Sequence, residues 1–162
     1  MEILVTPWRM EYIKHGAQSD ACIFCALLAA TGSDAERFIL HRDPEAFLVL
    51  NIYPYTPGHL MAVPYRHASN LSDLTAAELD ALWRLSQLGE RAVRRAYGCR
   101  SVQIGANLGR PAGAGVPAHV HLHVVTWPER GLWERWAGAA KPPETVRESY
   151  ARLTAVLGEL RG

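Results

Sequence analysis

Three histidines alternate with aliphatic residues in the second half of the chain. His119, His121 and His123 are separated by Val120 and Leu122. Because successive side chains of a strand point to opposite faces, this spacing predicts three imidazoles on one face. An imidazole near its ordinary pKa can attack a phosphate ester or exchange a proton with it. The alternative is a strand that only presents polar rings to water.

The three imidazoles start too far apart to share one metal ion easily. Alternate side chains on a strand start about 6.6 Å apart, so the outer pair starts about 13 Å apart. Zinc–nitrogen bonds are only about 2.0–2.1 Å long. At most two of the rings converge easily on one ion, which leaves at least one imidazole for catalysis.

A glycine-rich segment at residues 107–117 precedes the histidines. Its glycines are Gly109, Gly113 and Gly115. Glycine permits close backbone approach, so the N–H groups of such a loop can surround an anion. The segment lacks the Gly-Lys-Ser/Thr of a P-loop, so the usual nucleoside triphosphatase chemistry has no support. Alone it would be an ordinary turn, but beside the histidines it indicates a phosphate site.

Cys22 and Cys25 have the spacing that intracellular proteins use for metal or redox chemistry. A redox pair is disfavoured because no βαβ unit surrounds the two residues. Three cysteines cannot form a closed set of disulfides, which favours a reducing cytoplasm. Cys99, alone after the long predicted helix, is expected to be structural.

The charge balance disfavours several classes of partner. Seventeen Lys and Arg oppose 16 Asp and Glu, a net charge of +1, so neither nucleic acid nor an anionic membrane is expected. Residues 1–81 carry 5 basic and 10 acidic groups, and residues 82–162 carry 12 and 6. The arginines of the second half either form a solvated helix face or attract a small polyanion. No segment approaches the roughly 18 apolar residues of a spanning helix, so we expect a soluble, cytoplasmic protein.

The elements that must position these residues follow from the apolar periodicity. Helices are predicted at 22–30, from the capping box of Thr75 and Glu78 to Gly98, and after Pro142 and Pro143. Strands are predicted at 37–41, 46–51, 59–65, 101–107 and 118–127. The first three strands lack helical crossovers, which favours antiparallel pairing. Five strands around one long helix make an α+β fold, and 162 residues without a repeat or linker make one domain.

The histidine run matches the signature of a known family. Residues 119–125, His-Val-His-Leu-His-Val-Val, match the His-φ-His-φ-His-φ-φ motif of the histidine triad (HIT) family of nucleotide hydrolases and transferases. The chain also resembles this family at Asn51, at 57–60, at 63–67 and at 107–109, over about residues 22–127. The resemblance implies a HIT-like fold, a five-stranded antiparallel sheet with one long helix and a C-terminal helix. A single domain at 1–162 would then comprise an arm at 1–21, a core at 22–127 and an extension at 128–162.

The resemblance also implies a role for each matching residue. His121 would attack the α-phosphorus of a nucleotide to form a covalent nucleotidyl-histidine, which water or a second phosphate then releases. His123 would lie against the α-phosphate, with His119 and His59 as the other histidines of the site. The implied substrate-binding residues are Asn51 for the ribose, Asn107, Gly113 and Gly115 for the phosphates, and Leu48 and Ile52 for the base. Core packing explains Leu48 and Ile52 equally well.

The chain departs from the family in the loop before the histidines. Many members have Ala-Gly-Gln there, whereas residues 112–118 supply no glutamine and are one residue longer. The longer loop is similar to that of bacterial diadenosine tetraphosphate phosphorylases of this family, which favours phosphorolysis to ADP and ATP. The alternatives are hydrolysis of dinucleoside polyphosphates, phosphoramidates or nucleotide esters, and a nucleotide-binding module with little turnover. Retention of all three histidines favours an enzyme.

The resemblance implies one structural Zn²⁺ per chain and no organic cofactor. Superfamily members with a structural zinc, including galactose-1-phosphate uridylyltransferases, have ligands at positions corresponding to Cys22, Cys25, His67 and His119. Four protein ligands argue against an open catalytic zinc. The alternative is that the thiols are merely buried and His67 caps a loop. The family also implies a homodimer, paired through the long helix and the adjoining strand, that binds an adenine nucleotide or dinucleoside polyphosphate.

Overall fold

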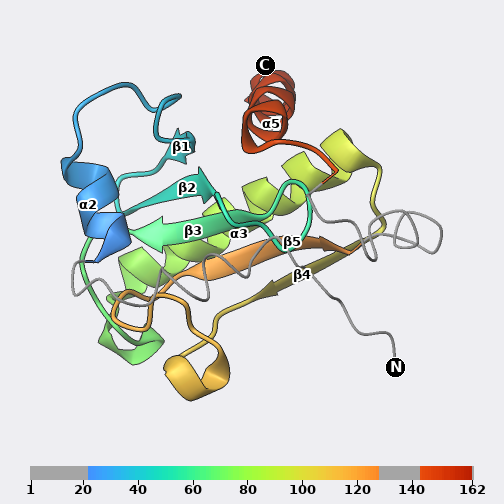
Figure 1. Cartoon of the computed structure of the whole chain (residues 1–162). Helices are drawn as coiled ribbons and strands as arrows, with labels where there is room; N and C mark the ends of the chain where they lie inside the picture. The colour runs from blue at the N-terminus through green and yellow to red at the C-terminus, as the bar shows by residue number, and fades with distance from the viewer. Residues whose placement is uncertain (1–21, 128–142, 162) are drawn as a thin grey trace.

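The computed structural model describes residues 22–127 and 143–161 (Figure 1). The expected arm at 1–21 and the part of the extension at 128–142 lie outside these residues. The helices are α2 (Ile23–Ala29), α3 (Ala76–Tyr97) and α5 (Val146–Arg161), with 3-10 turns η3 (Leu71–Asp73) and η4 (Arg110–Ala112). The strands are β1 (Ile39–Arg42), β2 (Ala46–Leu50), β3 (Leu60–Pro64), β4 (Ser101–Gly105) and β5 (Leu122–Trp127).

The strands form one antiparallel sheet in the order β1-β2-β3-β5-β4. The predicted α+β fold with a five-stranded antiparallel sheet is therefore confirmed. Met61 of β3 and Gly105 of β4 both lie opposite His123 of β5. Paired residues of an antiparallel sheet have their side chains on the same face. Met61 and Gly105 therefore flank His123 on the face that carries the histidine.

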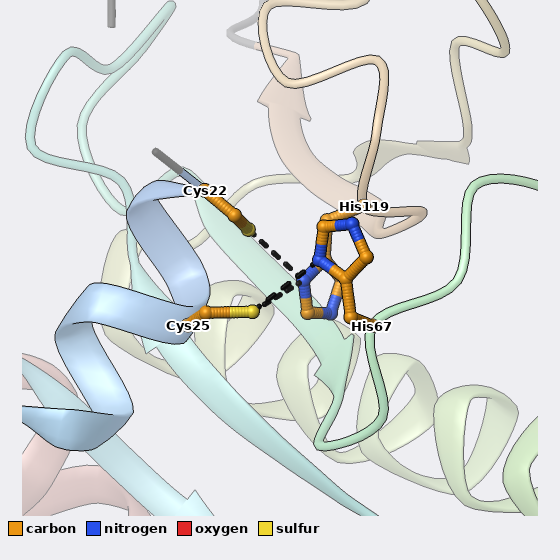
Figure 2. A group of neighbouring side chains, drawn as sticks. All are labelled: Cys22, Cys25, His67 and His119. Atoms are coloured by element: carbon orange, nitrogen blue, oxygen red, sulfur yellow. Dashed lines mark hydrogen bonds between the residues drawn. The ribbon is translucent and has the colours of Figure 1, made fainter. Parts of the chain in front are cut away.

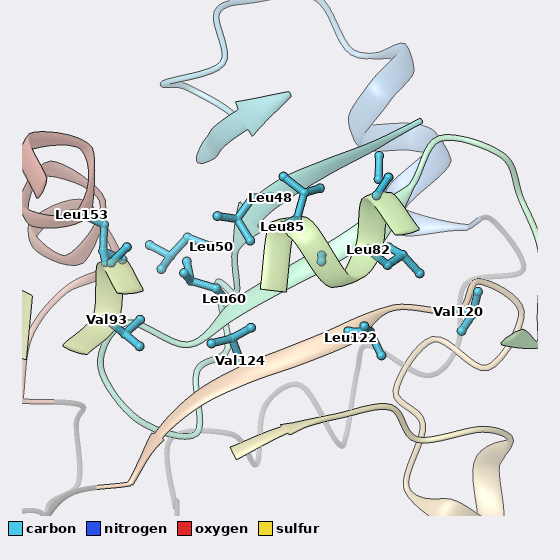
Figure 3. Close-up of a cluster of buried hydrophobic side chains, with 14 of the residues drawn as sticks. Leu48, Leu50, Leu60, Leu82, Leu85, Val93, Val120, Leu122, Val124 and Leu153 are labelled. Atoms are coloured by element: carbon cyan, nitrogen blue, oxygen red, sulfur yellow. The ribbon is translucent and has the colours of Figure 1, made fainter. Parts of the chain in front are cut away.

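Helix α3 covers one face of this sheet (Figure 3). Its amphipathic stripe packs Leu82, Leu85 and Val93 against the strands, and α5 adds Leu153. The strand residues of this core include Leu48, Leu60, Val120, Leu122 and Val124. Because side chains alternate along a strand, the residues between them point to the opposite face. That opposite face carries the histidines.

A smaller apolar cluster lies on the histidine face of the sheet. Its buried members are Phe24 from α2 and Ile39, Phe47, Val49, Met61 and Val63 from the strands. Helix α2 rests on this face through Phe24, its one buried residue. The sheet therefore has two different surfaces, a broad core under α3 and a narrower one beside the functional groups. None of the described helices is both long and apolar enough to cross a membrane.

The ends of α3 are set by the residues that the sequence indicated. The Thr75 hydroxyl accepts the backbone N–H of Glu78, and the Glu78 carboxylate accepts the N–H of Thr75 at 2.7 Å. Gly98 ends the helix with a φ of 62°, a left-handed conformation that glycine adopts without strain. The predicted capping box and stop are both confirmed.

Strand β5 is shorter than the predicted strand at 118–127. It begins at Leu122, because Pro64 has no N–H with which to extend the ladder of β3 beyond Ala62. The backbone N–H of Val120 instead donates to the carbonyl of Ala68 at 2.7 Å. The side chains still alternate through this segment, since His119 and His121 stay on the face opposite Val120 and Leu122.

Helix α5 begins at Val146, later than the prolines at which the sequence predicted its opening. Of these prolines only Pro143 lies within the described residues, and it precedes the helix. Thr145 and Glu148 form a capping box at the start of the helix. The hydroxyl of Thr145 accepts from the N–H of Glu148, and the Glu148 carboxylate accepts the N–H of Thr145 at 2.7 Å. A side-chain cap satisfies helical N–H groups that the prolines cannot.

The buried carboxylate of Glu78 makes stability depend on pH. Both of its oxygens accept from Arg66 at 2.7 Å, and this pairing lowers the pKa of Glu78 from 4.5 to about 2. A depressed folded-state pKa stabilises the protein fully above about pH 4.5, and this stabilisation is lost as the pH falls toward 2. We expect Glu78→Gln to lower the free energy of unfolding at pH 7 by roughly 1–3 kcal/mol and to flatten its acid dependence.

Urea unfolding of parent and variant between pH 7 and pH 3 measures this difference. Glu90→Gln is the matched control, because Glu90 lies on the same helix and pairs with Arg94 at the surface. We expect it to cost less than about 0.5 kcal/mol. Equal losses in the two variants, or a Glu78→Gln deficit that persists unchanged at pH 3, would contradict the assignment.

Candidate active site and metal centre

Three histidine rings meet where β3 and β5 lie side by side. His121 and His123 have ring centroids 4.6 Å apart, in an edge-to-face arrangement. His59, which directly precedes β3, places Nε2 2.9 Å from Nδ1 of His123. The structure therefore brings together three of the residues that the sequence proposed for catalysis.

The hydrogen bond of His121 fixes which nitrogen can react. Its Nδ1 lies 2.9 Å from the backbone oxygen of His119. A carbonyl oxygen only accepts, so Nδ1 carries the proton and the neutral ring keeps its lone pair on Nε2. Burial lowers the pKa of His121 below its ordinary value, so the ring is neutral at pH 7. A neutral imidazole with a defined lone pair has the form required of a nucleophile.

The same reasoning orients His59 and His123. The backbone N–H of Tyr55 donates to Nδ1 of His59 at 3.1 Å, and the amide nitrogen of Asn51 lies 3.3 Å from the same atom. Nδ1 of His59 is therefore an acceptor, and its Nε2 proton is donated to Nδ1 of His123. In a neutral His123 the ring proton then lies on Nε2. Asn51 also accepts the N–H of Tyr53 at 2.9 Å, which holds its amide beside His59.

A pocket adjoins His123 at the edge of the sheet. Its lining includes Tyr55, Gln103, Gly105, Asn107, His123 and Trp127. Gly105 lies opposite His123, and a Cβ there would meet nothing within 4 Å, so the space beside the ring is open. The sequence singled out Asn107 and His123 but missed Gln103 and Tyr55. Strand alternation from His123 across the β4–β5 pair would have indicated Gln103.

The glycine-rich loop reaches this pocket through Asn107. The Asn107 amide nitrogen donates to the backbone oxygen of Gly113 at 3.4 Å. Gly113 has a φ of 88°, a conformation that a side chain at this position would strain. Gly115 lies on the same loop and is exposed. The loop is thus folded back on Asn107, which lines the pocket together with His123.

Four potential metal ligands converge next to the histidines (Figure 2). Cys22 and Cys25 extend from the start of α2 toward His67 and His119, and all four ligand atoms lie within 4.8 Å of one another. The Nδ1 atom of His119 lies 3.2 Å from Sγ of Cys22 and 3.7 Å from Sγ of Cys25. Nδ1 of His67 lies 3.3 Å from Sγ of Cys25.

These separations suit a tetrahedral zinc ion. Zinc bonds of roughly 2.0–2.3 Å place neighbouring nitrogen and sulfur ligands roughly 3.3–3.8 Å apart. The other ring nitrogen of His119, Nε2, lies 2.9 Å from the backbone oxygen of Pro64, so Nε2 carries the proton and Nδ1 keeps its lone pair toward the thiols. A zinc-bound histidine commonly donates its second N–H to a carbonyl in this way. The residues therefore fit the metal.

One predicted base-pocket residue is misplaced. Leu48 is fully buried in the core under α3, because it pairs with Ala62 and shares that residue's face rather than the face of Met61 and His123. The prediction for Leu48 is therefore wrong, and core packing explains it. Ile52 is 53% exposed, in the segment after Asn51.

Val49 and Met61 are among the apolar residues that lie on the histidine face. Neither was predicted from the sequence to lie there. Strand alternation could have indicated Val49, because residues two apart on a strand share a face and Val49 stands two residues before Asn51.

Comparisons with known proteins show which proteins this chain resembles. A family model described as the HIT domain matches residues 33–129. The AP-4-A phosphorylase of Mycobacterium tuberculosis (strain ATCC 25618 / H37Rv) is 35% identical over 148 residues, 86% of this chain and 71% of that protein. An asymmetrical bis(5'-nucleosyl)-tetraphosphatase of Schizosaccharomyces pombe is 26% identical over 138 residues, 70% of this chain and 75% of that protein.

A solved structure with the same fold is that of a zinc-bound protein. The crystal structure of a Zn-bound histidine triad family protein from Mycobacterium smegmatis has a TM-score of 0.71 and 25% sequence identity. The structural match covers 87% of this chain and 96% of the Mycobacterium smegmatis chain. On the family match, the fold and the identity to its relatives, the chain belongs to the HIT domain family.

Proposed function

We propose that this protein cleaves dinucleoside polyphosphates, diadenosine tetraphosphate in particular, through a covalent intermediate on His121. The observation that carries the proposal is the buried ring of His121, whose Nδ1 proton is donated to a backbone carbonyl and whose Nε2 is therefore the nucleophile. The relatives named AP-4-A phosphorylase and bis(5'-nucleosyl)-tetraphosphatase support a nucleotide substrate of this class.

Cleavage would proceed by two displacements at one phosphorus atom. Nε2 of His121 attacks the α-phosphorus, a phosphorus–nitrogen bond forms, and the bond to the bridging oxygen breaks with release of ATP. An oxygen of inorganic phosphate then attacks the same phosphorus. The phosphorus–nitrogen bond breaks, ADP leaves, and the electron pair returns to Nε2. His123 holds an Nε2 proton for an oxygen of the reacting phosphates, because its Nδ1 accepts from His59.

Inorganic phosphate is the acceptor that the sequence of the loop favours. Residues 112–118 offer no glutamine side chain to orient a water molecule. The similarity to a protein named as a phosphorylase supports the same choice. Hydrolysis is the second candidate, because a tetraphosphatase is also among the relatives. The homodimer and the cytoplasmic location expected from the resemblance stay predictions.

We further propose that Cys22, Cys25, His67 and His119 hold one structural Zn²⁺. The mutual distances of the four ligand atoms and the proton on Nε2 of His119 support this assignment. With four protein ligands a tetrahedral ion has no position for water or substrate, so the ion would stabilise the fold rather than react. Bound there, zinc would tie α2 to the segments that carry His67 and His119.

Product analysis tests the proposed reaction. We expect pure protein with diadenosine tetraphosphate and inorganic phosphate to yield ADP and ATP, and to yield little product without phosphate. His121→Ala removes the nucleophile and is expected to lower the rate on the order of 10³-fold or more. His41→Ala is the matched control, because His41 lies on β1, which β2 and β3 separate from β5. We expect it to keep the parent rate within about two-fold.

The products distinguish the two candidates. AMP and ATP formed without phosphate would establish hydrolysis and overturn phosphorolysis. Turnover by His121→Ala at the parent rate would overturn the covalent mechanism for either acceptor.

Metal analysis tests the zinc site. We expect one zinc per chain by elemental analysis of the parent, and well under half of that in Cys25→Ser. Loss of the ion is expected to lower the unfolding temperature by about 10 °C or more. Cys99→Ser is the matched control, because Cys99 lies outside the cluster and contacts the backbone of Val93. Full zinc content in Cys25→Ser, or an unfolding temperature unchanged after metal removal, would contradict the proposal.

A further inference from the structure

Phe24 joins the cysteine cluster to the reacting histidine. It lies on α2 between Cys22 and Cys25, and it is only 2% exposed. The centroid of its ring lies 5.3 Å from that of His119 and 5.0 Å from that of His121. One aromatic side chain therefore contacts both the histidine assigned to the metal and the histidine assigned to catalysis.

The other contact that orients His121 comes from the same place. Its Nδ1 proton is donated to the backbone oxygen of His119, whose own ring reaches both cysteines. The third neighbour of the His121 ring is His123, which belongs to the active site itself. Of these three contacts of the His121 ring within the described residues, one is therefore made by a cluster residue, His119, and one by Phe24, which lies between Cys22 and Cys25.

Helix α2 is anchored mainly at its C-terminal end. Arg37 donates to the backbone oxygens of Leu27 and Ala30, and Leu27 and Leu28 pack against the small apolar cluster.

The N-terminal end of α2, which carries Phe24, has less support. The helix is seven residues long, its N-cap Cys22 makes no side-chain capping bond, and its first turn holds no acidic residue. An isolated helix of this length is unstable in water, so its position depends on its tertiary contacts. Phe24 is its one buried residue, and the flanking cysteines would supply bonds to a metal. A metal ion held by these cysteines would therefore fix where Phe24 lies.

We propose that Phe24 is a positioning residue that couples occupancy of the Cys22–Cys25–His67–His119 cluster to the orientation of His121. The proposal rests on the function proposed above, for the ion and for His121 as nucleophile. With the ion bound, Phe24 is pressed against the ring of His121 and keeps its Nδ1 proton on the carbonyl of His119. Without the ion, α2 loosens, and the ring of His121 also samples the form with its proton on Nε2.

The test compares Phe24→Leu with Phe47→Leu. Phe47 is a fully buried phenylalanine of the same apolar cluster, but its ring stacks on Tyr65 rather than on a histidine. Both substitutions remove a ring from the same cluster, so both lower the thermal stability. Phe24→Met, whose unbranched side chain adapts more easily to an irregular space, is the second variant in case Phe24→Leu does not fold.

The first measurement is the proton position on the His121 ring. Ring ¹⁵N shifts of labelled protein report the ratio of the two neutral forms, at a pH about two units above the ordinary histidine pKa. Ring currents barely alter these shifts, so losing the phenyl ring does not mimic the effect. We expect the parent to hold the Nδ1-protonated form with zinc and to lose part of it when a chelator removes the ion. Phe24→Leu should show the mixed ratio with zinc bound and respond little to the chelator.

The second measurement is turnover of diadenosine tetraphosphate with phosphate by the zinc-loaded proteins. Phe24→Leu and Phe24→Met should lower kcat about ten-fold and change KM less than about two-fold, because a misoriented nucleophile slows the chemical step more than it weakens binding. Phe47→Leu should keep the parent kcat and the parent ¹⁵N ratio.

Three results would overturn the coupling. One is a His121 ratio in the parent that does not respond to removal of the ion. Another is a Phe24 variant with the parent ratio and the parent kcat. The third is a Phe47→Leu variant that changes both as much as Phe24→Leu, since Phe24 would then act only as packing. The ¹⁵N ratio needs no substrate, so failure of the proposed reaction is distinguishable from failure of the coupling.

Discussion

The candidate active site depends on the backbone of one residue, His119. Its carbonyl accepts the Nδ1 proton of His121, and its ring turns toward Cys22 and Cys25. The segment that contains it leaves the sheet just before β5, because Pro64 cannot extend the ladder. The backbone oxygen of Pro64 instead accepts from the ring of His119, and Val120 bonds to Ala68. This short irregular stretch fixes both the geometry of the Cys22–Cys25–His67–His119 cluster and the tautomer of His121.

The two faces of the sheet differ: one carries the large apolar core, and the other carries the histidines. Leu122 and Val124 face the core under α3, while His121 and His123 face the small cluster beside α2. The packed core holds the backbone of β5 and of the residue just before it. The positions of His121 and His123 are therefore fixed. The histidines sit where β3 and β5 meet, and β4 contributes the open space at Gly105. A chain with this alternation can place several imidazoles within contact distance at little conformational cost.

Local signals in the sequence predicted much of this arrangement. The capping box at Thr75, the stop at Gly98 and the alternation of the histidines depend on neighbours in the chain, and the structure agrees with each. The misassignment of Leu48 has a different cause. The face that a strand residue occupies depends on the cross-strand register. Periodicity within one strand shows which residues share a face, but it does not show which face points to the core, until a residue such as Asn51 is assigned to the functional face. The proton positions on His59 and His121 depend on the N–H of Tyr55 and the carbonyl of His119, which lie only four and two residues away. Residue types do not reveal the local backbone conformation that turns these groups toward the rings. Phe24 was an ordinary apolar residue in the sequence because its histidine contacts span about a hundred residues.

The central claim is a covalent bond between Nε2 of His121 and the α-phosphorus of the substrate. The most direct measurement is mass spectrometry of protein mixed with diadenosine tetraphosphate in the absence of phosphate and quenched within one turnover. The account predicts that the protein gains the mass of one adenylyl group, that the group maps to the peptide containing His121, and that added phosphate discharges it as ADP. Product formation with no labelled protein at any quench time, or a label on His119 or His123 instead, would contradict it.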